Sequence, residues 1–290
     1  MEYVFHIAIM LNIYIMLVLS ANLTIGMANL LTMCQAAFYG IGAYIGTFFL
    51  MRFHLPFVVI VAVVSLVTGV FSFLVSYASV KLKGDYFVLA TMGFQLIVYT
   101  ILYNWISVTQ GPYGIPGIPG IRILGIWELS GVFTYFVLSL VLAVGVILLF
   151  NNLHDSPYGR KLRAVKADEV MVQSMGRDTA AAKSWAFFIS AAVAGVAGVL
   201  YASYVSYIDP TSFTLNESIF IISALFIGGI GNIKGPVFGA LFVVLLPELL
   251  RFVGLPDAIA ANLRQIIYGL SLILVVYFRP QGLFGKSVMK

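Results

Sequence analysis

The side chains that could ligate a metal or act as nucleophiles are few in this 290-residue chain, and they lie far apart. The three histidines are His6, His54 and His154, and none belongs to a spacing typical of zinc or iron ligands. The one cysteine, Cys34, lies within an apolar stretch, which excludes a disulfide framework and a thiolate cluster. The sequence therefore predicts neither a metal site nor a covalent catalytic centre.

Acidic side chains inside apolar stretches would indicate proton or ion coupling, because such residues are costly in a membrane and usually functional. The three candidates, Asp209, Glu217 and Glu248, fall near the ends of apolar segments. The sequence also contains no repeated carbonyl-filter motif and no ring-forming acid. These patterns disfavour an ion-coupled secondary transporter and a channel.

One segment near the C-terminus resembles a phosphate-binding loop. Residues 280–287 read PQGLFGKS, but Pro280 stands where the first glycine is required, and only three residues follow Ser287. The helix whose N-terminus would face the phosphate is therefore missing. We expect no nucleotide, metal or other cofactor on this chain, so ATP and Mg²⁺ could act only through another subunit.

The composition is that of a membrane protein. Apolar residues make up 61% of the chain and charged residues 9%, against about 45–50% and about 25% in globular proteins. No Asp, Glu, Lys or Arg occurs in residues 3–51 or 55–80, and about 20 apolar residues suffice to span a bilayer. We therefore expect a polytopic protein whose net charge of +5 reflects its topology and not a nucleic-acid partner.

The sequence predicts an all-α fold of about nine membrane-spanning helices, within a range of eight to ten, in a single transmembrane domain of residues 1–290. The expected segments are 4–23, 25–50, 56–80, 86–104, 131–151, 184–206, 217–230, 235–253 and 263–278. The seventh and eighth are short enough to be re-entrant or tilted.

Positive charges in the loops predict the orientation, because Lys and Arg accumulate on the cytoplasmic side. With nine spans, the side that carries residues 152–183 and the C-terminus receives Lys81, Lys83, Arg160, Lys161, Arg163, Lys166, Arg177, Lys183, Lys234, Arg279, Lys286 and Lys290. The opposite side receives Arg52, Arg122, Arg251 and Arg264. We therefore expect the N-terminus outside and the C-terminus in the cytoplasm.

The outer loop, residues 105–130, has a distinctive composition. Glycine and proline make up most of residues 111–120, which forbids a regular helix there and favours a chain of turns. The loop is nevertheless apolar, unlike a flexible linker. It is expected either to pack over its own bundle or to present a docking surface to a partner.

The cytoplasmic loop, residues 152–183, predicts a helix with clear end signals. Ser156 is suited to the N-cap, and Pro157 to the first helical position. Helix-compatible sequence runs from Arg160 to Met175, and Gly176 is suited to the left-handed residue that follows a helix end.

This predicted helix is amphipathic. Apolar residues recur at helical spacing beside basic ones, namely Leu162, Val165, Val172 and Met175 with Arg160, Lys161, Arg163 and Lys166. Such a helix either lies on the lipid surface or docks into a groove of a partner protein. Asp178 or Thr179 is expected to cap the next membrane helix.

Glycines four residues apart predict close contacts between helices. They form two runs, Gly42 with Gly46, and Gly231 with Gly235 and Gly239. Tight helix packing is their expected role. The alternative is that these glycines let spans move against one another or approach a substrate.

The sequence as a whole resembles the permease subunits of branched-chain amino-acid ABC importers, most closely their LivM-like half. The resemblance covers essentially the whole chain, and its combination of motifs is specific although no single motif is. The segments that carry it are Asn22–Gly26 leading into Gln35–Tyr44, Lys83–Phe87 with Thr91–Phe94, Gly111–Pro119, Asp155–Gly176, Gly228–Gly239 and Arg279–Gly285.

This resemblance implies a type II importer architecture and a role for the cytoplasmic helix. Permeases of the family press such a helix into a cleft on the ATP-binding subunit. By position, the coupling residues would be Arg160, Leu162, Arg163, Val165, Asp168, Glu169, Met175 and Gly176. The sequence departs from the broader ABC importer pattern, because Val170 stands where a glutamate is expected and Glu169 is displaced by one position.

The resemblance also implies partners and a place in the cell. The chain would lie in the inner or cytoplasmic membrane of a prokaryote as a multi-pass protein. It would pair with a second, distinct permease subunit and with two ATP-binding subunits, and it would receive substrate from an extracytoplasmic solute-binding protein. ATP-driven alternating access would then move a branched-chain or other hydrophobic amino acid between the two permease halves.

Neutral polar side chains within the spans are candidates for lining that pathway. They are Asn22, Asn29, Gln35 and Gln95. The competing interpretation is that these side chains form hydrogen bonds between helices of the chain itself.

Three other functions remain as alternatives. The same scaffold could carry urea or short amides, because selectivity in such importers rests largely with the binding protein. A secondary transporter or channel is disfavoured by the missing coupling charges and by the cytoplasmic helix. A membrane-embedded enzyme would need convergent nucleophiles, acids or metal ligands at span depth, and the sequence offers none.

Overall fold

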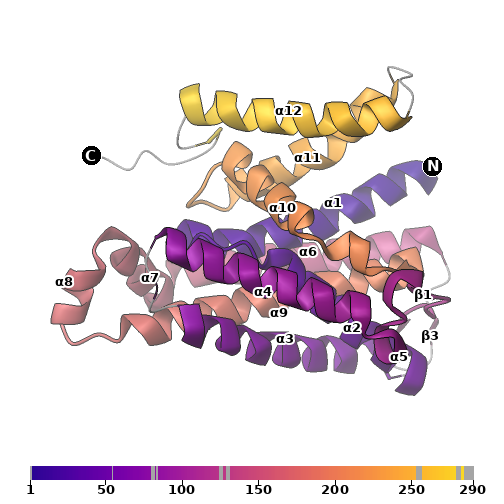
Figure 1. Cartoon of the computed structure of the whole chain (residues 1–290), viewed down its shortest axis with the longest axis horizontal. Coiled ribbons are helices and arrows are strands. Elements are labelled where there is room, and N and C mark those ends of the chain that lie inside the picture. The colour runs from indigo at the N-terminus through magenta and orange to yellow at the C-terminus, as the bar shows by residue number, and fades with distance from the viewer. Residues whose placement is uncertain are drawn as a thin grey trace.

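The computed structural model is a bundle of helices that run roughly along one long axis, with loops gathered at both ends (Figure 1). It describes residues 2–53, 55–79, 82, 84–123, 127–128, 131–252, 257–278 and 282–283. Outside the described residues lie His54, most of the loop-like segment 280–287, and five of the charges that predict the topology, namely Lys81, Lys83, Arg279, Lys286 and Lys290.

The elements follow one another as α1 (Glu2–Ala21), the π-helix η1 (Asn22–Met27), α2 (Gln35–Phe53), α3 (Phe57–Ser79), α4 (Asp85–Asn104), α5 (Ile106–Thr109), the 3₁₀ turn η2 (Gly111–Tyr113), β1 (Ile115–Pro116), β2 (Arg122–Ile123), β3 (Trp127–Glu128), α6 (Val132–Asp155), α7 (Pro157–Ala167), α8 (Glu169–Ser174), α9 (Thr179–Val205), β4 (Tyr207–Ile208), the 3₁₀ turn η3 (Pro210–Phe213), α10 (Leu215–Gly228), α11 (Lys234–Phe252) and α12 (Asp257–Phe278). The strands form two short antiparallel pairs, β1 with β4 and β2 with β3. Outside these pairs, the regular structure of the described residues is helical.

Each of the nine predicted spans overlaps a helix. Within the described residues, six helical segments are long and apolar enough to cross a membrane, namely Glu2–Met27, Gln35–Phe53, Phe57–Tyr77, Asp85–Asn104, Val132–Asp155 and Thr179–Val205. The chain is therefore a multi-pass membrane protein. The remaining predicted spans correspond to α11, α12 and the 14-residue α10, which is shorter than the roughly 20 residues of a full span.

The boundary between the first two spans differs from the prediction. The sequence suggested a second span from residue 25, but α1 continues without interruption into η1, and α2 begins only at Gln35. The intervening turn is held by side chains, since the backbone N–H of Met33 donates to Thr91 Oγ1 at 3.1 Å and that of Ala36 to Ser218 Oγ at 2.9 Å. Buried backbone groups need such partners, and these two come from distant helices.

Helices α2 and α9 approach each other closely in the core. A side chain at Gly42 would overlap the backbone of Gly195, and a side chain at Gly198 would overlap the carbonyl oxygen of Tyr39. Gly46 faces Val199 in the same contact. Small residues allow this approach, which membrane helices need because no hydrophobic effect holds them together.

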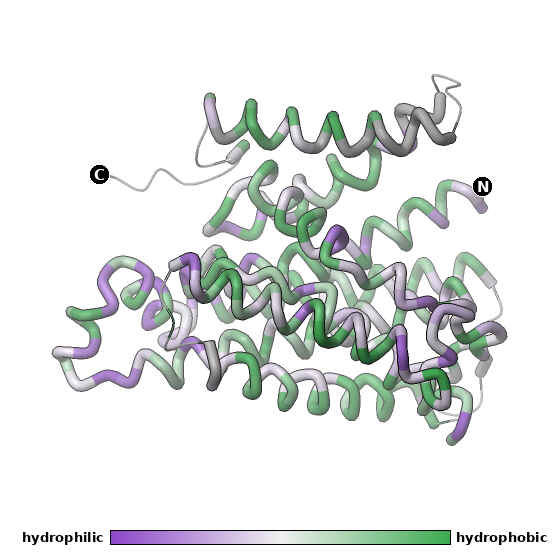
Figure 2. The backbone as a smooth tube through the Cα atoms, viewed as in Figure 1, coloured by the Kyte–Doolittle hydropathy of each residue, from purple (hydrophilic) through white to green (hydrophobic). Residues whose placement is uncertain are grey.

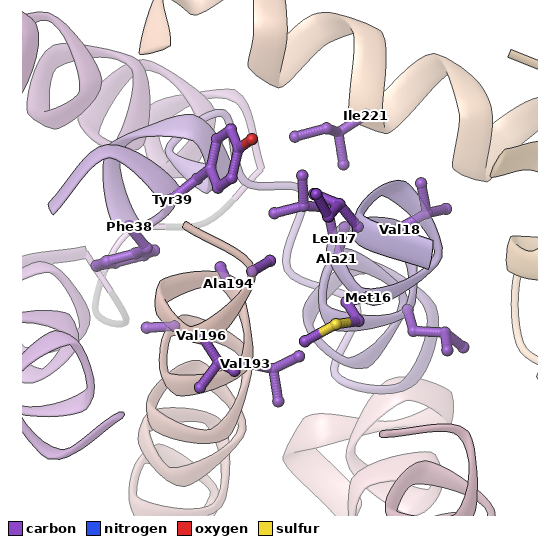
Figure 3. Close-up of a cluster of buried hydrophobic side chains, with 14 of the residues drawn as sticks. Met16, Leu17, Val18, Ala21, Phe38, Tyr39, Val193, Ala194, Val196 and Ile221 are labelled. Atoms are coloured by element: carbon purple, nitrogen blue, oxygen red, sulfur yellow. The ribbon is translucent and has the colours of Figure 1, made fainter. Parts of the chain in front are cut away.

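Apolar side chains of four helices fill the space around this contact. Figure 3 shows the cluster where α1, α2, α9 and α10 meet, with Met16, Leu17, Val18, Ala21, Phe38, Tyr39, Val193, Ala194, Val196 and Ile221 labelled. Polar contacts add to this packing, such as the bond from Asn12 Nδ2 to Ser139 Oγ at 2.9 Å between α1 and α6. The helix α9 is the most buried of the six candidate spans.

The outer loop packs on its own bundle over the residues that the structure describes. Ile115, Ile118 and Ile121 are buried. The backbone N–H groups of Gly117 and Ile118 both donate to the carbonyl of Ser206, directly after α9. Strand β1 also pairs with β4 there, which matches the packed-lid alternative for this part of the loop.

We predict that Gly42→Val destabilises the protein by about 1–3 kcal/mol, because the added side chain must push α2 away from α9. Gly145→Val is the matched control, since Gly145 is also within a span but is exposed, with open space where a side chain would be added. Thermal unfolding in detergent measures both. Equal midpoints for the two variants would contradict this account of the core.

Candidate functional site

The loop of residues 152–183 begins with the capped helix that the sequence predicts. The hydroxyl of Ser156 accepts a hydrogen bond from the backbone N–H of Gly159 at 3.0 Å, and Pro157 occupies the first helical position of α7. Gly159 lies so close to the end of α6 that a side chain would overlap the carbonyl oxygens of Leu153 and His154. Helix α7 is therefore set tightly against the end of α6.

The predicted single helix from Arg160 to Met175 is in fact two helices. Helix α7 ends at Ala167, Asp168 adopts an extended backbone, and α8 starts at Glu169. The Asp168 carboxylate caps α8 by accepting from the backbone N–H of Met171 at 2.9 Å. An aspartate favours this N-cap role over a position inside a helix, which explains the break.

A left-handed residue ends α8. Gly176 has φ +73°, and its N–H donates to the carbonyl of Gln173 while that of Arg177 donates to Val172. Open space surrounds Gly176, so the positive φ and not a close neighbour accounts for glycine there. Asp178 then caps α9 through the N–H of Ala181 at 2.9 Å.

The apolar face of α7 packs on the chain's own bundle. Leu162 and Val165 are buried. The hydroxyl of Tyr158 donates to the carbonyl of Ala182 at 2.7 Å, and the ammonium of Lys166 donates to the carbonyl of Gly26 at 2.8 Å. These contacts fasten α7 to α9 and to the π-helix η1.

The exposed apolar side chains lie on α8 and directly after it. Val170, Met171 and Met175 are 68%, 56% and 66% exposed. Figure 1 places α8 at the far end of the bundle, and Figure 2 shows apolar stretches there between polar ones. We call these three side chains the apolar tip.

The sequence pattern did not find the whole apolar tip. Val170 and Met171 were missed, because a single helix from Arg160 to Met175 puts them off its apolar face. The Asp-Glu pair at Asp168 and Glu169 was the available signal for a new helix start.

Basic side chains border the apolar tip. A cavity of about 340 Å³ is lined by Arg160, Lys161 and Arg177 together with Val172 and Met175. This end of the molecule therefore combines exposed methionines with positive charge, which suits a partner's groove better than bulk water.

The predicted coupling arginines also stabilise the end of α6. The guanidinium of Arg160 donates to the carbonyl of Asp155 at 2.8 Å, and that of Arg163 to the carbonyl of His154 at 2.7 Å. Cations interact favourably with the unpaired carbonyls at a helix C-terminus. Both residues therefore help to orient α7 on the bundle.

An ion pair joins α8 to the start of α9. The Lys183 ammonium lies 2.6 Å from Glu169 Oε1, and the side chains are 10% and 29% exposed. Thr179 adds a hydroxyl hydrogen bond to the same carboxylate at 3.3 Å. The apolar tip is thus connected to the most buried span through Glu169.

Three of the four pathway candidates are engaged in hydrogen bonds inside the chain. Asn22 donates to the carbonyl of Asn232 at 2.9 Å and accepts from the backbone of Gly231 at 3.2 Å. Gln35 donates to the Ser20 and Ser190 hydroxyls, and Gln95 donates to the carbonyl of Phe213 at 2.8 Å. The contacts of Gln35 are the helix-to-helix bonds that the sequence offered as the competing interpretation, whereas Asn22 bonds to the turn after α10 and Gln95 to η3. Asn29 alone of the four is exposed, in a left-handed conformation with φ +56°.

The second glycine run divides into two kinds of position. Gly235 and Gly239 allow α11 to approach α10, because side chains there would overlap the carbonyl oxygens of Gly229 and Ala224. Gly231 instead lies in the turn between these helices, with φ +89° and open space around it. Its role is turn formation, which corrects the helix-packing prediction for that residue.

Within the residues that the structure describes, no three His, Cys, Asp or Glu side chains are arranged to hold a metal ion.

We predict that Glu169→Gln weakens the attachment of α8 by about 1–3 kcal/mol, because the nearly buried Lys183 ammonium loses its counter-ion. Hydrogen exchange of the α8 amides measures this opening. The double variant Glu169→Gln with Lys183→Met is expected to recover part of the loss, since it removes the uncompensated charge. A hydrogen-exchange rate of the α8 amides in Glu169→Gln equal to that of the wild type would contradict the role of this ion pair.

Comparison with known proteins agrees with this description of a multi-pass membrane protein. Residues 3–276 match the family described as the branched-chain amino acid transport system / permease component. No solved structure matches the chain.

Curated relatives give the same family. The high-affinity branched-chain amino acid transport system permease protein LivM of Salmonella typhimurium is 32% identical over 97% of this chain and 70% of its own length. The probable LivM permease of Methanocaldococcus jannaschii is 30% identical over 72% and 62%, and the probable LivH permease of the same organism is 24% identical over 96% and 90%. The chain belongs to the branched-chain amino acid transport permease family.

Proposed function

We propose that this chain is a permease subunit of an ATP-driven ABC importer for branched-chain or other hydrophobic amino acids, and that it forms half of the translocation pathway. The observation that carries the proposal is the family match along residues 3–276 of a chain with six candidate spans and an exposed coupling segment. Relatives that match nearly the whole of this chain are named as branched-chain amino acid transport permeases.

The proposed membrane arrangement has nine spans in a type II importer architecture, with the N-terminus outside and the C-terminus in the cytoplasm. Two features support it. The loop that contains α7 and α8 and the turn between α10 and α11 lie at one end of the bundle, and the outer loop lies at the other (Figure 1). The first end carries the larger share of the positive charges, as expected for a cytoplasmic face.

The proposed partners follow from the same arrangement. A second, distinct permease subunit completes the pathway, and two ATP-binding subunits with ATP and Mg²⁺ contact the cytoplasmic end. An extracytoplasmic solute-binding protein delivers substrate at the end that carries the outer loop. In this proposal ATP hydrolysis takes place on the ATP-binding subunits and not on this chain.

In this proposal the apolar tip enters a cleft on an ATP-binding subunit. Val170, Met171 and Met175 supply the apolar contact, and flexible methionines adapt well to a partner surface. The charged border formed by Arg160 and Arg177 adds electrostatic complementarity.

Movement of the tip would reach the spans through two contacts. The Glu169–Lys183 ion pair leads to α9, and the bond from Lys166 to the carbonyl of Gly26 leads to η1 and therefore to α1. Both α9 and α1 are core helices, so closure of the ATP-binding subunits would rearrange the permease as a unit. Such transmission is the requirement for alternating access.

We predict that Met171→Asp lowers ATP-dependent leucine uptake by about tenfold or more, because a charge replaces a central apolar contact with the ATP-binding subunit. The assay uses proteoliposomes that contain the chain with its partner subunits and the solute-binding protein. Met171→Leu is the control, since it keeps an apolar side chain of similar size.

Two outcomes would contradict the proposal. Full uptake by a correctly folded Met171→Asp variant would remove the coupling role of the tip. Uptake that depends on a proton gradient but not on ATP would instead support a secondary transporter.

A further inference from the structure

A mixed charged and apolar cavity lies next to the coupling segment. Its volume is about 410 Å³, within the range of small-molecule sites, which begins at about 300 Å³. It lies among the turn after η1, the start of α4, the helices α7 and α8, and the start of α9. All of these elements belong to the end of the bundle that the proposed function assigns to the cytoplasm.

One wall of the cavity carries a cation with unused donors. The ammonium of Lys166 donates one hydrogen bond to the carbonyl of Gly26 at 2.8 Å, and an ammonium has three donors in total. The side chain is partly buried, and this burial lowers its pKa from the ordinary lysine value. An anion that entered the cavity would compensate the lost hydration of Lys166.

The opposite charge is supplied by a different helix. Asp85 lies in the first turn of α4 and lines the same cavity, and among the described residues it forms no ion pair. The other two charges on the lining, Glu169 and Lys183, neutralise each other at 2.6 Å. Among the described lining residues, Lys166 and Asp85 are therefore the cation and the carboxylate that a ligand could satisfy.

The rest of the lining is largely aliphatic or aromatic. Leu30, Phe87 and Val165 are buried, and Leu31 and Val88 add to the apolar lining. An apolar lining with a few placed polar groups is the usual composition of a small-molecule site. The ligand that matches all three features has a carboxylate, an ammonium and a branched apolar side chain.

We propose that this cavity binds an aliphatic amino acid from the cytoplasmic side, with its carboxylate at Lys166, its ammonium at Asp85 and its side chain against the apolar lining. This inference rests on the proposed function, because it takes the cavity to open toward the cytoplasm. A bound amino acid would join α7 to α4 through the two charges. It would thereby hold the coupling segment in place and slow import when the product accumulates.

The test measures equilibrium binding of radiolabelled leucine to the purified importer in nanodiscs, without the solute-binding protein. The wild-type complex is expected to bind leucine saturably. Lys166→Met and Asp85→Asn are each expected to raise the Kd about tenfold or more, because each removes a charge-assisted hydrogen bond. Val88→Trp fills the cavity without altering a charge and is expected to reduce leucine binding as well. It tests the cavity if a charge variant fails to assemble.

Controls separate this cavity from other sites. Lys161→Met removes a cation of the neighbouring surface that does not line this cavity, so its Kd is expected to equal that of the wild type. Isovalerate and isopentylamine, which lack the ammonium and the carboxylate of leucine, are expected to compete poorly. Competition by glycerophosphoethanolamine but not by isoleucine would assign the cavity to a lipid headgroup and overturn the proposal.

The remaining outcomes distinguish the inference from the proposed function. ATP-driven leucine uptake by a wild-type complex that binds no leucine without the binding protein would overturn the cavity assignment alone. Unchanged leucine binding in Asp85→Asn and Val88→Trp would do the same. Absence of uptake of every branched-chain amino acid would instead overturn the proposed function.

Discussion

The close approach of α2 and α9 is the constraint on which the rest of the molecule depends. Lipid is as apolar as the side chains, so spans associate through packing and hydrogen bonds and not through exclusion of water. Gly42 and Gly198 let the two backbones meet directly, since a side chain at either position would overlap the backbone of the other helix. This contact fixes the position of α9, which is the most buried candidate span.

Helix α9 in turn positions both ends of the protein. At one end, Asp178 caps the helix and Lys183 holds Glu169, which sets the place of α8 and the apolar tip. At the other end, the carbonyl of Ser206 receives the backbone of the outer loop. The apolar tip and the glycine- and proline-rich loop are therefore attached to opposite ends of a single helix.

Local signals in the sequence predicted the parts of this arrangement that depend on neighbouring residues. The capping role of Ser156 and the left-handed Gly176 each depend on a few adjacent residues. The start of α2 at Gln35 could not be predicted in this way. It depends on Thr91 and Ser218, which are far along the chain and become neighbours only after the helices pack.

In the candidate site, too, some features follow from neighbouring residues and others only from the packing of distant segments. The amphipathic pattern of α7 correctly indicated an apolar face at Leu162 and Val165, but a pattern alone does not say which surface covers that face. The structure covers it with the chain's own helices and leaves the apolar tip of α8 exposed. Likewise, Asn22, Gln35 and Gln95 are polar residues within apolar stretches, and only the packed structure shows that they bond to distant parts of the chain.

The most direct test of the central claim is to purify the chain from its native membrane in mild detergent and to identify stoichiometric co-purifying proteins by mass spectrometry. The account predicts two copies of an ATP-binding subunit and one second permease, with loss of the ATP-binding subunits when Met171 is changed to Asp. A chain that purifies alone and still transports leucine after removal of the apolar tip would contradict it.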